Sequence, residues 1–251
     1  MPPGRMPFSI PPSPISVKMG EDLNSYQATN GEPWCIFDAM DLFKQNGDQY
    51  GRIARYYDAM LEPMIHSLRN KVSRVVSENG PGPVLDLCCG TGRQLIMLGR
   101  QGVSGVGVDM SSAMLNVAKR KNNGMTRFIR GDVTRLPFGD GRFSAAMVTL
   151  ALHENPEPAR QIILAEAKRV LRPDGRFIIV DYSRLEPNNH GLGGLLTSKV
   201  EWMAGDNHYY NFKDFMAKGG VEGMCDRGGL AVERVADFFF GSVGLYITKS
   251  D

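Results

Sequence analysis

A glycine loop between two short apolar runs constrains this chain more than any other feature. Residues 84–92 read VLDLCCGTG, so an apolar run containing Asp86 opens into a turn with glycines at 90 and 92. A helical pattern follows, and a second apolar run, 105–109, ends at another carboxylate. In a strand–loop–helix–strand unit of this kind, ligands bind beyond the carboxyl ends of the strands. The arrangement suits a ligand with a nucleoside at one end and a small charged group at the other.

The same alternation of short apolar runs and helical patterns continues along the chain. Apolar runs of this length predict strands, and apolar residues that recur three or four positions apart predict helices. The link between the last two runs is too short for a parallel crossover, so these two strands must pair antiparallel. The sequence therefore predicts an α/β fold with a doubly wound, mostly parallel seven-stranded sheet that ends in an antiparallel hairpin. The predicted strands are 84–87, 105–109, 127–130, 143–150, 176–181, 232–240 and 243–248; the predicted helices are 34–43, 56–76, 92–101, 112–121 (capped by Ser111), 156–171 and 212–228, with a turn at 172–175.

Composition sets limits on the class of protein. The chain has 251 residues and a net charge of +2, which gives no electrostatic footprint for nucleic acid or acidic membranes. Its longest apolar stretch, 145–152, is too short to span a bilayer, and its start lacks the apolar block of a signal peptide. The cysteines at 35, 88, 89 and 225 show no CxxC pair. We therefore expect a cytoplasmic protein with reduced thiols, without a metal, a nucleic-acid partner or an integral membrane segment.

Changes in composition divide the chain into three parts. We expect residues 1–17, which are rich in proline, to form a flexible extension, and residues 18–79 to form a helical cap. Residues 80–251 then form the ligand-binding domain. Within this domain a glycine-rich stretch at about 185–212 breaks the alternation, and it predicts a lid inserted over the site.

Two features separate the glycine loop from a dinucleotide-binding loop. The third glycine of the dinucleotide pattern would fall at position 95, which is Leu95. A carboxylate at Asp86 would repel a phosphate but favour a cationic ligand.

Asp109 lies 23 positions after Asp86, close to the spacing of about 20 residues for an acid that holds ribose hydroxyls. The alternative for Asp109 is a cap on the helix that begins near Ser112.

The chain resembles class I S-adenosylmethionine-dependent methyltransferases of the ubiquinone/menaquinone C-methyltransferase-like family (methyltransferase type 11). Four segments carry the resemblance in the family's order: VLDLCCGTG at 84–92, GVDMSSAML at 107–115, GDVTRLPF at 131–138 and EAKRVLRPDGRF at 166–177. Cys88 stands where the family usually has glycine or alanine, and Asp174 stands where it has glycine. The resemblance implies a Rossmann-like methyltransferase fold, with S-adenosylmethionine as cofactor and S-adenosylhomocysteine as product.

The resemblance also implies roles for single residues. Asp86 orients the amino group of the cofactor's methionine end, which lies along the loop backbone, and Asp109 accepts hydrogen bonds from both ribose hydroxyls. Asp132 accepts from the adenine amino group, unless it is only a polar turn residue after a strand. Leu150 lines the pocket near the sulfonium. The expected cofactor residues are Asp86, Leu87, Cys88, Gly90, Gly92, Asp109, Met110 (on the adenine face), Asp132, Val133 (whose amide donates to the ring) and Leu150.

Two histidines are candidates for a general base, which methyl transfer needs only when the attacking atom carries a proton of high pKa. His153 follows the predicted strand 143–150, where acceptor-side residues of this fold often lie, and His208 ends the irregular segment. Histidine titrates near neutrality, so it suits proton removal. Each has a structural alternative, because His153 can cap the helix that begins near Pro156 and His208 can hold the lid by a hydrogen bond.

The residues expected around the acceptor are Tyr50, Tyr57, Glu154, Trp202 and Tyr209. The aromatic ones equally fit packing between the first helices and the lid. An aromatic pocket indicates a small apolar or aromatic acceptor, quinone-like or another secondary metabolite, attacked through carbon, oxygen or nitrogen. Two other functions stay open: a non-catalytic S-adenosylmethionine-binding regulatory or assembly protein, and a nicotinamide-dependent dehydrogenase, which Leu95 and Asp86 disfavour. The oligomeric state is open too, a homodimer included.

Overall fold

The computed structural model of the protein describes residues 57–78, 82–122, 124–184 and 206–248. All of these residues belong to one compact unit, Leu42–Asp251. The predicted helix 34–43, the predicted extension 1–17 and most of the predicted cap and lid lie outside the described residues. The division into extension, cap and lid therefore stays a prediction.

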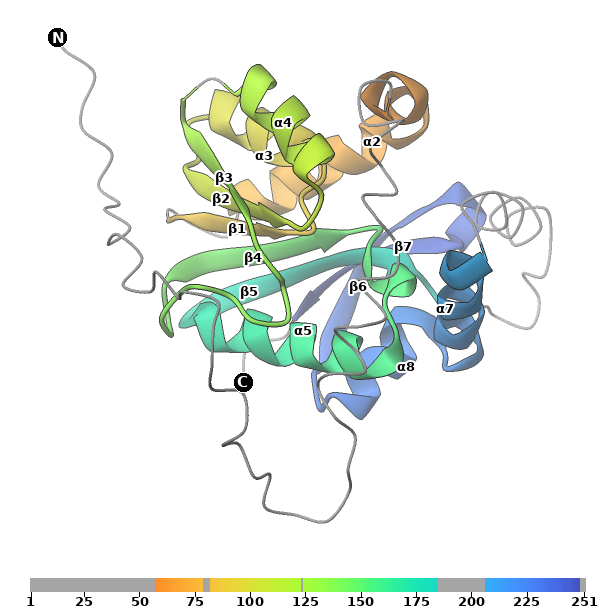
Figure 1. Ribbon diagram of the computed structural model, residues 1–251. Coiled ribbons are helices and arrows are strands. Elements are labelled where there is room, and N and C mark those ends of the chain that lie inside the picture. Colours follow the sequence, from red (N-terminus) through yellow and green to blue (C-terminus); the bar gives the residue numbers. More distant parts are fainter. Residues whose placement is uncertain (1–56, 79–81, 123, 185–205, 249–251) are drawn as a thin grey trace, which may run out of the picture. The chain divides into compact units, whose positions relative to one another are not determined.

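Seven strands form one sheet, in the order β3-β2-β1-β4-β5-β7-β6 (Figure 1). The first five strands run parallel, whereas β7 pairs antiparallel with both β5 and β6. This topology confirms the predicted fold class, including the antiparallel hairpin at its end. The strands are β1 (Val84–Leu87), β2 (Gly105–Asp109), β3 (Thr126–Arg130), β4 (Phe143–Thr149), β5 (Leu171–Tyr182), β6 (Val232–Phe238) and β7 (Val243–Thr248).

Helices cover both faces of the sheet. Figure 1 shows α2, α3 and α4 on one side of the sheet and α5 and α8 on the other. The helix α4 begins as the sequence predicts, because the Ser111 hydroxyl accepts a hydrogen bond from the Met114 amide at 3.1 Å. The helices are α2 (Tyr57–Glu78), α3 (Arg93–Arg100), α4 (Ser112–Lys121), α5 (Glu157–Val170), α7 (Asp206–Ala217) and α8 (Gly220–Arg227), with short 3₁₀ turns η1 (Leu152–Glu154) and η2 (Phe239–Gly241).

The core lies along the central strands. Every residue of β1 is buried, and so are the first six residues of β4, from Phe143 to Val148. Strands covered on both faces bury consecutive residues instead of alternate ones. This is why the sequence shows continuous apolar runs here, and it fixes the strand ends firmly enough to position a site beyond them.

One predicted helix is wrong, because residues 212–228 form parts of two helices. The helix α7 ends at Ala217 and α8 begins at Gly220. Between them Gly219 and Gly220 have left-handed backbones, with φ of 88° and 59°. A side chain is strained in this conformation, whereas glycine is not. The paired glycines therefore mark a turn between two helices.

Two other predicted boundaries differ from the structure. The turn predicted at 172–175 lies within β5, where four residues bulge opposite one residue of β4, because Phe143 pairs with Leu171 and Ala145 with Arg176. The strand predicted at 232–240 is also shorter in the structure, since β6 ends at Phe238. The next two residues, Phe239 and Phe240, have φ of 50° and 57°, which is incompatible with an extended strand.

Candidate functional site

The loop after β1 has an unusual backbone. Cys88, Gly90 and Gly92 all lie in the left-handed region, with φ of 55°, 53° and 67°. The amide of Cys89 donates to the Val108 carbonyl at 3.1 Å, which holds the loop to the adjacent strand β2. A left-handed backbone costs a non-glycine residue about 1–2 kcal/mol. The strain at Cys88 is the kind that persists at functional sites, where the surrounding structure enforces it.

The two glycines of the loop have different surroundings. A Cβ built on Gly90 would meet no protein atom within 4 Å, whereas one built on Gly92 would lie 2.4 Å from Cε1 of Phe128. Gly92 therefore serves the packing of the loop against β3. Gly90 leaves open space beside the backbone, so a ligand can approach the main chain closely there.

Asp109, the last residue of β2, joins the glycine loop to the start of α4. Its Oδ2 accepts from the Gly90 amide at 2.7 Å, and its Oδ1 accepts from the Ser111 amide at 2.8 Å. Because the Ser111 side chain is the N-cap of α4, Asp109 is not the helix cap that was its alternative role. The carboxylate instead fixes the loop backbone at Gly90.

Asp86 lies near the end of β1 and is only 3% exposed. Among the described residues no hydrogen bond involves its carboxyl group. Burial raises the pKa of Asp86 to about 8, the neighbouring Asp109 adds to this rise, and Arg69 opposes it. A buried carboxyl group without a hydrogen-bond donor is a position that favours a cationic ligand.

Carboxylates from four strand ends converge on the glycine loop. Burial raises the pKa of the Cys88 thiol well above its usual value, and the carboxylates of Asp109, Glu154, Asp86 and Asp132 raise it further. Asp86 lies in β1, Asp109 ends β2, and Asp132 and Glu154 follow β3 and β4. An acidic edge of this kind attracts a cation and repels a phosphate, and a cation bound there would favour the charged form of Asp86.

The remaining expected cofactor residues line the same edge of the sheet. Asp132 forms a turn in which its Oδ1 accepts from the Thr134 amide at 2.8 Å and from the Thr134 hydroxyl at 2.7 Å, as its structural alternative predicts. Met110 is 45% exposed, whereas Leu87 and Val133 are buried. Leu150 is a second strained residue, with φ of 51°.

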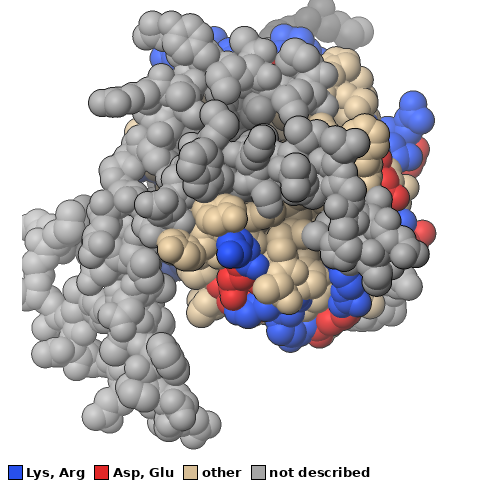
Figure 2. Space-filling view, turned by 90° about the vertical axis from the view of Figure 1, so that its right-hand side faces the viewer, with Lys and Arg blue, Asp and Glu red and all other residues tan. Residues whose placement is uncertain are grey.

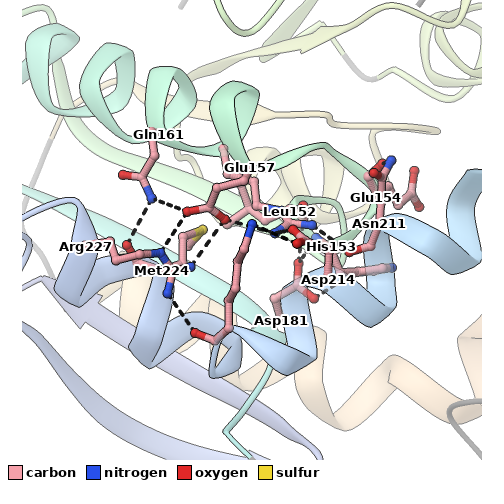
Figure 3. A network of polar contacts seen from close by, with 12 residues as sticks. Leu152, His153, Glu154, Glu157, Gln161, Asp181, Asn211, Asp214, Met224 and Arg227 are labelled. Carbon is pink, nitrogen blue, oxygen red and sulfur yellow. Dashed lines mark hydrogen bonds and ion pairs between the residues drawn. The ribbon is translucent and has the colours of Figure 1, made fainter. Parts of the chain in front are cut away.

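His153 lies in η1, the 3₁₀ turn after β4, and is buried against the end of β5. Its Nδ1 is 2.6 Å from Oδ1 of Asp181, whose Oδ2 accepts from the amides of Leu152 at 2.8 Å and His153 at 3.2 Å (Figure 3). The ring packs edge-on against Tyr182 and Phe212, with centroids 4.8 and 6.2 Å away. The side chain of His153 therefore contacts β5 and α7.

A buried arginine connects η1 to the helix α7. Arg160 of α5 is fully buried, and its Nε donates to the Leu152 carbonyl at 3.2 Å. Its Nη1 and Nη2 contact Asp214 at 3.0 Å and the Asn211 carbonyl at 2.6 Å. Asn211 in turn donates to the Glu154 carbonyl at 2.7 Å, and Figure 3 shows these groups side by side. The acceptor-side turn and α7 are thus held together by polar contacts.

Several predicted site residues are described only in part. Tyr209 lies on α7, half-buried, with the Lys213 ammonium 5.6 Å from its ring centroid. His208 and Tyr57 belong to α7 and α2, but their side chains lie outside the described part, as do Tyr50 and Trp202 entirely. Their proposed roles stay predictions.

Sequence reasoning missed two functional candidates, Asp181 and Arg160. Asp181 has the same signal that singled out Asp86 and Asp109, a carboxylate at the end of a predicted parallel strand. Arg160 has no such signal, because a basic residue on a helix is usually solvated and only the fold reveals its burial.

Three further observations concern metal sites, membrane-spanning helices and surface charge in the described residues. Within those ranges no group of histidine, cysteine and acidic side chains is arranged to hold a metal ion. No helix there is both long and apolar enough to cross a bilayer. On the face drawn in Figure 2, acidic and basic side chains lie next to one another. Among the described residues, Arg227 pairs with Glu157 at 2.9 Å.

Comparison with known proteins agrees with this geometry. A profile of the methyltransferase-domain family matches residues 84–175. A demethylmenaquinone methyltransferase from Thermotoga maritima is 30% identical over 219 residues, which cover 79% of this chain and 93% of the relative. An uncharacterised methyltransferase from Synechocystis is 40% identical over 106 residues, which cover 42% of this chain and 49% of the relative.

Coverage is lower for some relatives, and one solved structure shows the same fold. The chain spans between 40% and 62% of the length of three curated relatives that it matches over shorter stretches. The solved structure of an O-methyltransferase family protein from Burkholderia thailandensis matches with a TM-score of 0.62 at 17% identity, over 80% of this chain and 60% of that protein.

Proposed function

Since this chain belongs to the class I S-adenosylmethionine-dependent methyltransferase family, we propose that it transfers a methyl group from S-adenosylmethionine to a small-molecule acceptor. One observation carries the proposal: acidic side chains at or near four neighbouring strand ends act on a strained glycine loop that has open space at Gly90, and one of them, Asp109, accepts from the Gly90 amide at 2.7 Å. This charge matches a cationic sulfonium cofactor and opposes a phosphate-bearing one.

The residues present fit the cofactor at each of its ends. Asp86 is buried, and its carboxyl group has no hydrogen-bond donor among the described residues, so it suits the positive methionine end, while the loop backbone at Gly90 allows close approach. Asp109 suits the ribose hydroxyls, and Met110 with Asp132 and the Val133 amide suits the adenine. When bound, S-adenosylmethionine supplies a methyl group on a positively charged sulfur that leaves readily. The chain's own contribution is to hold the acceptor in line and exclude water, worth about 7–11 kcal/mol.

We propose His153 as the base for an acceptor that must lose a proton. Asp181, 2.6 Å from Nδ1, favours the tautomer that carries its proton there, so Nε2 is the nitrogen that accepts one. The proton on Nδ1 stays between the ring and the carboxylate throughout. His208 remains a second, untested candidate.

We propose an apolar or aromatic acceptor, such as a quinone-like compound in its reduced hydroquinone form. The buried rings of Tyr182 and Phe212 beside His153 support this class, as does the similarity to a demethylmenaquinone methyltransferase from Thermotoga maritima. A hydroquinone carries phenolic protons, so a base at His153 suits it. The cytoplasmic location remains a prediction from the sequence, and the oligomeric state stays open.

Calorimetric titration tests the cofactor assignment. We expect heat on addition of S-adenosylmethionine and none on addition of NADH, and the opposite result would favour a dehydrogenase. Asp109→Ala should weaken the binding of S-adenosylmethionine by more than about tenfold, because ribose hydroxyls and the Gly90 amide lose their acceptor. Unchanged affinity would contradict the role of Asp109.

Methyl incorporation separates an enzyme from a non-catalytic binding protein. With labelled S-adenosylmethionine and a naphthohydroquinone of short side chain, we expect label in the acceptor, and cell extracts extend the search to other acceptors. Binding of the cofactor without incorporation into either would favour the regulatory alternative. His153→Gln should lower turnover by about 10²–10⁴-fold at unchanged cofactor affinity, and equal losses in both would indicate a structural role instead.

A further inference from the structure

The glycine loop is held from a second side, by a helix that precedes it in the chain. We propose that Asp58 of α2 is a positioning residue that keeps residues 88–92 in the conformation that binds the cofactor. The inference rests on the proposed function for the identity of that cofactor. The proposal adds the helix α2 to the site, whereas the other candidate cofactor residues lie at or after the ends of strands.

The contact between Asp58 and the loop is short and largely buried. The Thr91 hydroxyl donates to Oδ1 of Asp58 at 2.6 Å, and Thr91 is 3% exposed between Gly90 and Gly92. The Asp58 side chain itself is only 13% exposed. Without this acceptor the Thr91 hydroxyl would be buried and unsatisfied, and the loop would have to move to solvate it.

Two carboxylates therefore hold two consecutive residues of the loop. Asp109 accepts from the Gly90 amide at 2.7 Å, and Asp58 accepts from the next side chain along, Thr91, at 2.6 Å. The residues around them, Cys88 and Gly92 among them, have left-handed backbones. A loop that includes a strained cysteine leaves this conformation readily unless its neighbours enforce it.

Asp58 also lies close to two basic side chains, those of Lys121 and Arg69. Its Oδ2 lies 2.6 Å from the Lys121 ammonium at the end of α4, and its Oδ1 lies 3.9 Å from Nη2 of Arg69. Arg69 is the cation that acts on Asp86 inside the site. One carboxylate thus joins α2, the loop and α4.

The expected effect on affinity follows from the population of the competent loop. If only a tenth of the molecules hold the loop as observed, the apparent Kd for the cofactor rises about tenfold, with every direct contact intact. A purely structural role for Asp58, fastening α2 to the domain, would lower the melting temperature and leave the Kd unchanged.

The test measures binding of S-adenosylmethionine and of S-adenosylhomocysteine to the full chain by calorimetry, with the melting temperature of each variant recorded alongside. Asp58→Ala and Thr91→Val should each raise the Kd about tenfold. The double variant should bind no more weakly than the weaker single variant, because both changes remove one contact. Thr91→Ser should restore binding, since it keeps the hydroxyl.

Lys121→Met provides the matched control. It removes the exposed ion pair of Asp58 without touching the loop, and it should leave the Kd within about twofold. Any of three results would overturn the inference. They are an equal loss of affinity in Lys121→Met, additive losses of affinity in the double variant, and a normal Kd in Thr91→Val. Thr91→Val and Thr91→Ser decide the matter even if Asp58→Ala does not fold. Absence of binding by the wild-type chain would overturn the proposed function itself, whereas normal wild-type binding with unaffected variants would overturn only the role of Asp58.

Discussion

Asp86 and Asp109 lie at the ends of adjacent strands, yet their carboxyl groups have different surroundings. Asp109 accepts hydrogen bonds from two backbone amides, whereas no hydrogen bond among the described residues involves the carboxyl group of Asp86. Hydrogen bonds stabilise the charged form of a carboxyl group, and burial without them stabilises the neutral form. Burial therefore favours the neutral form of Asp86 in the cofactor-free protein, although its position in the sequence motif looks equivalent to that of Asp109.

The first prediction concerns stability and pH. The unfolded chain releases the proton of Asp86 near its ordinary pKa of about 4, while the folded protein keeps it up to about pH 8. The unfolded state thus binds fewer protons within this window. The free energy of unfolding of the cofactor-free protein should fall from about pH 4 to about pH 8, by up to about 1.4 kcal/mol per pH unit.

Urea unfolding across this pH range provides the measurement. In Asp86→Asn the fall with rising pH should flatten, because the variant has no proton to lose at this position. Asp140→Asn serves as the control, since the Asp140 side chain is 80% exposed and its change should leave the profile in place. A wild-type profile that rises through the same window would contradict the burial of a neutral Asp86.

The second prediction separates the two loop glycines. Gly90→Ala should cost about 1–2 kcal/mol of stability from its left-handed backbone, and its methyl group should block the space proposed for the cofactor. Gly92→Ala adds a clash with Phe128, 2.4 Å away, so it should cost about 2–5 kcal/mol. Unfolding and calorimetry together check this. Unchanged cofactor binding in folded Gly90→Ala would argue against a ligand at that position.

At the scale of elements, η1, α5 and α7 behave as one assembly. Arg160 donates to a carbonyl of η1 and to a carbonyl and a carboxylate of α7. Its guanidinium also lies 4.9 Å above the ring of Phe215, a third contact with α7. A fully buried cation with several acceptors is costly to remove, because every acceptor then loses its partner.

The third prediction tests this assembly. Arg160→Met should lower the free energy of unfolding by about 3 kcal/mol, because the Leu152 and Asn211 carbonyls lose their donor. Hydrogen exchange should become faster in η1 and α7 together. Lys218→Met is the comparison, since it removes a half-exposed ion pair with the same Asp214 and should change stability by less than about 1 kcal/mol. Faster exchange in α7 alone would show that the two elements are not coupled.

For the whole molecule, cofactor binding and folding are linked. At a hundredfold excess over its Kd, S-adenosylmethionine should stabilise the fold by about 2.7 kcal/mol. For a domain of this size the melting temperature should then rise by about 5–10 °C, as thermal unfolding would show. NADH at the same concentration should cause no shift. A rise with NADH and none with S-adenosylmethionine would contradict the proposed cofactor.

Local patterns predicted most of the sheet, since the central strands β1 and β4 are continuous apolar runs that are almost wholly buried. They also predicted that Asp86, Asp109 and Asp132 lie near one edge of the sheet, where parallel strands end, while the cofactor roles of these residues stay predictions. Contacts between distant segments were out of reach: Thr91 and Asp58 are 33 positions apart, and Arg160 and Asp214 are 54 apart. No periodicity marks such pairs. The division at Gly219 was also missed, because glycine inside a helical pattern signals weakness without indicating a break.

The placement of β7 has a consequence for biosynthesis. It is the last of the seven strands in chain order, yet it lies between β5 and β6 (Figure 1). Its final residue, Thr248, accepts a hydrogen bond from the Phe177 amide of β5 at 3.0 Å. While the ribosome is still translating this strand, β5 presents an open edge of buried apolar residues, and such edges invite pairing with other nascent chains. The sheet is therefore closed on this side only when the final strand has emerged and joined it.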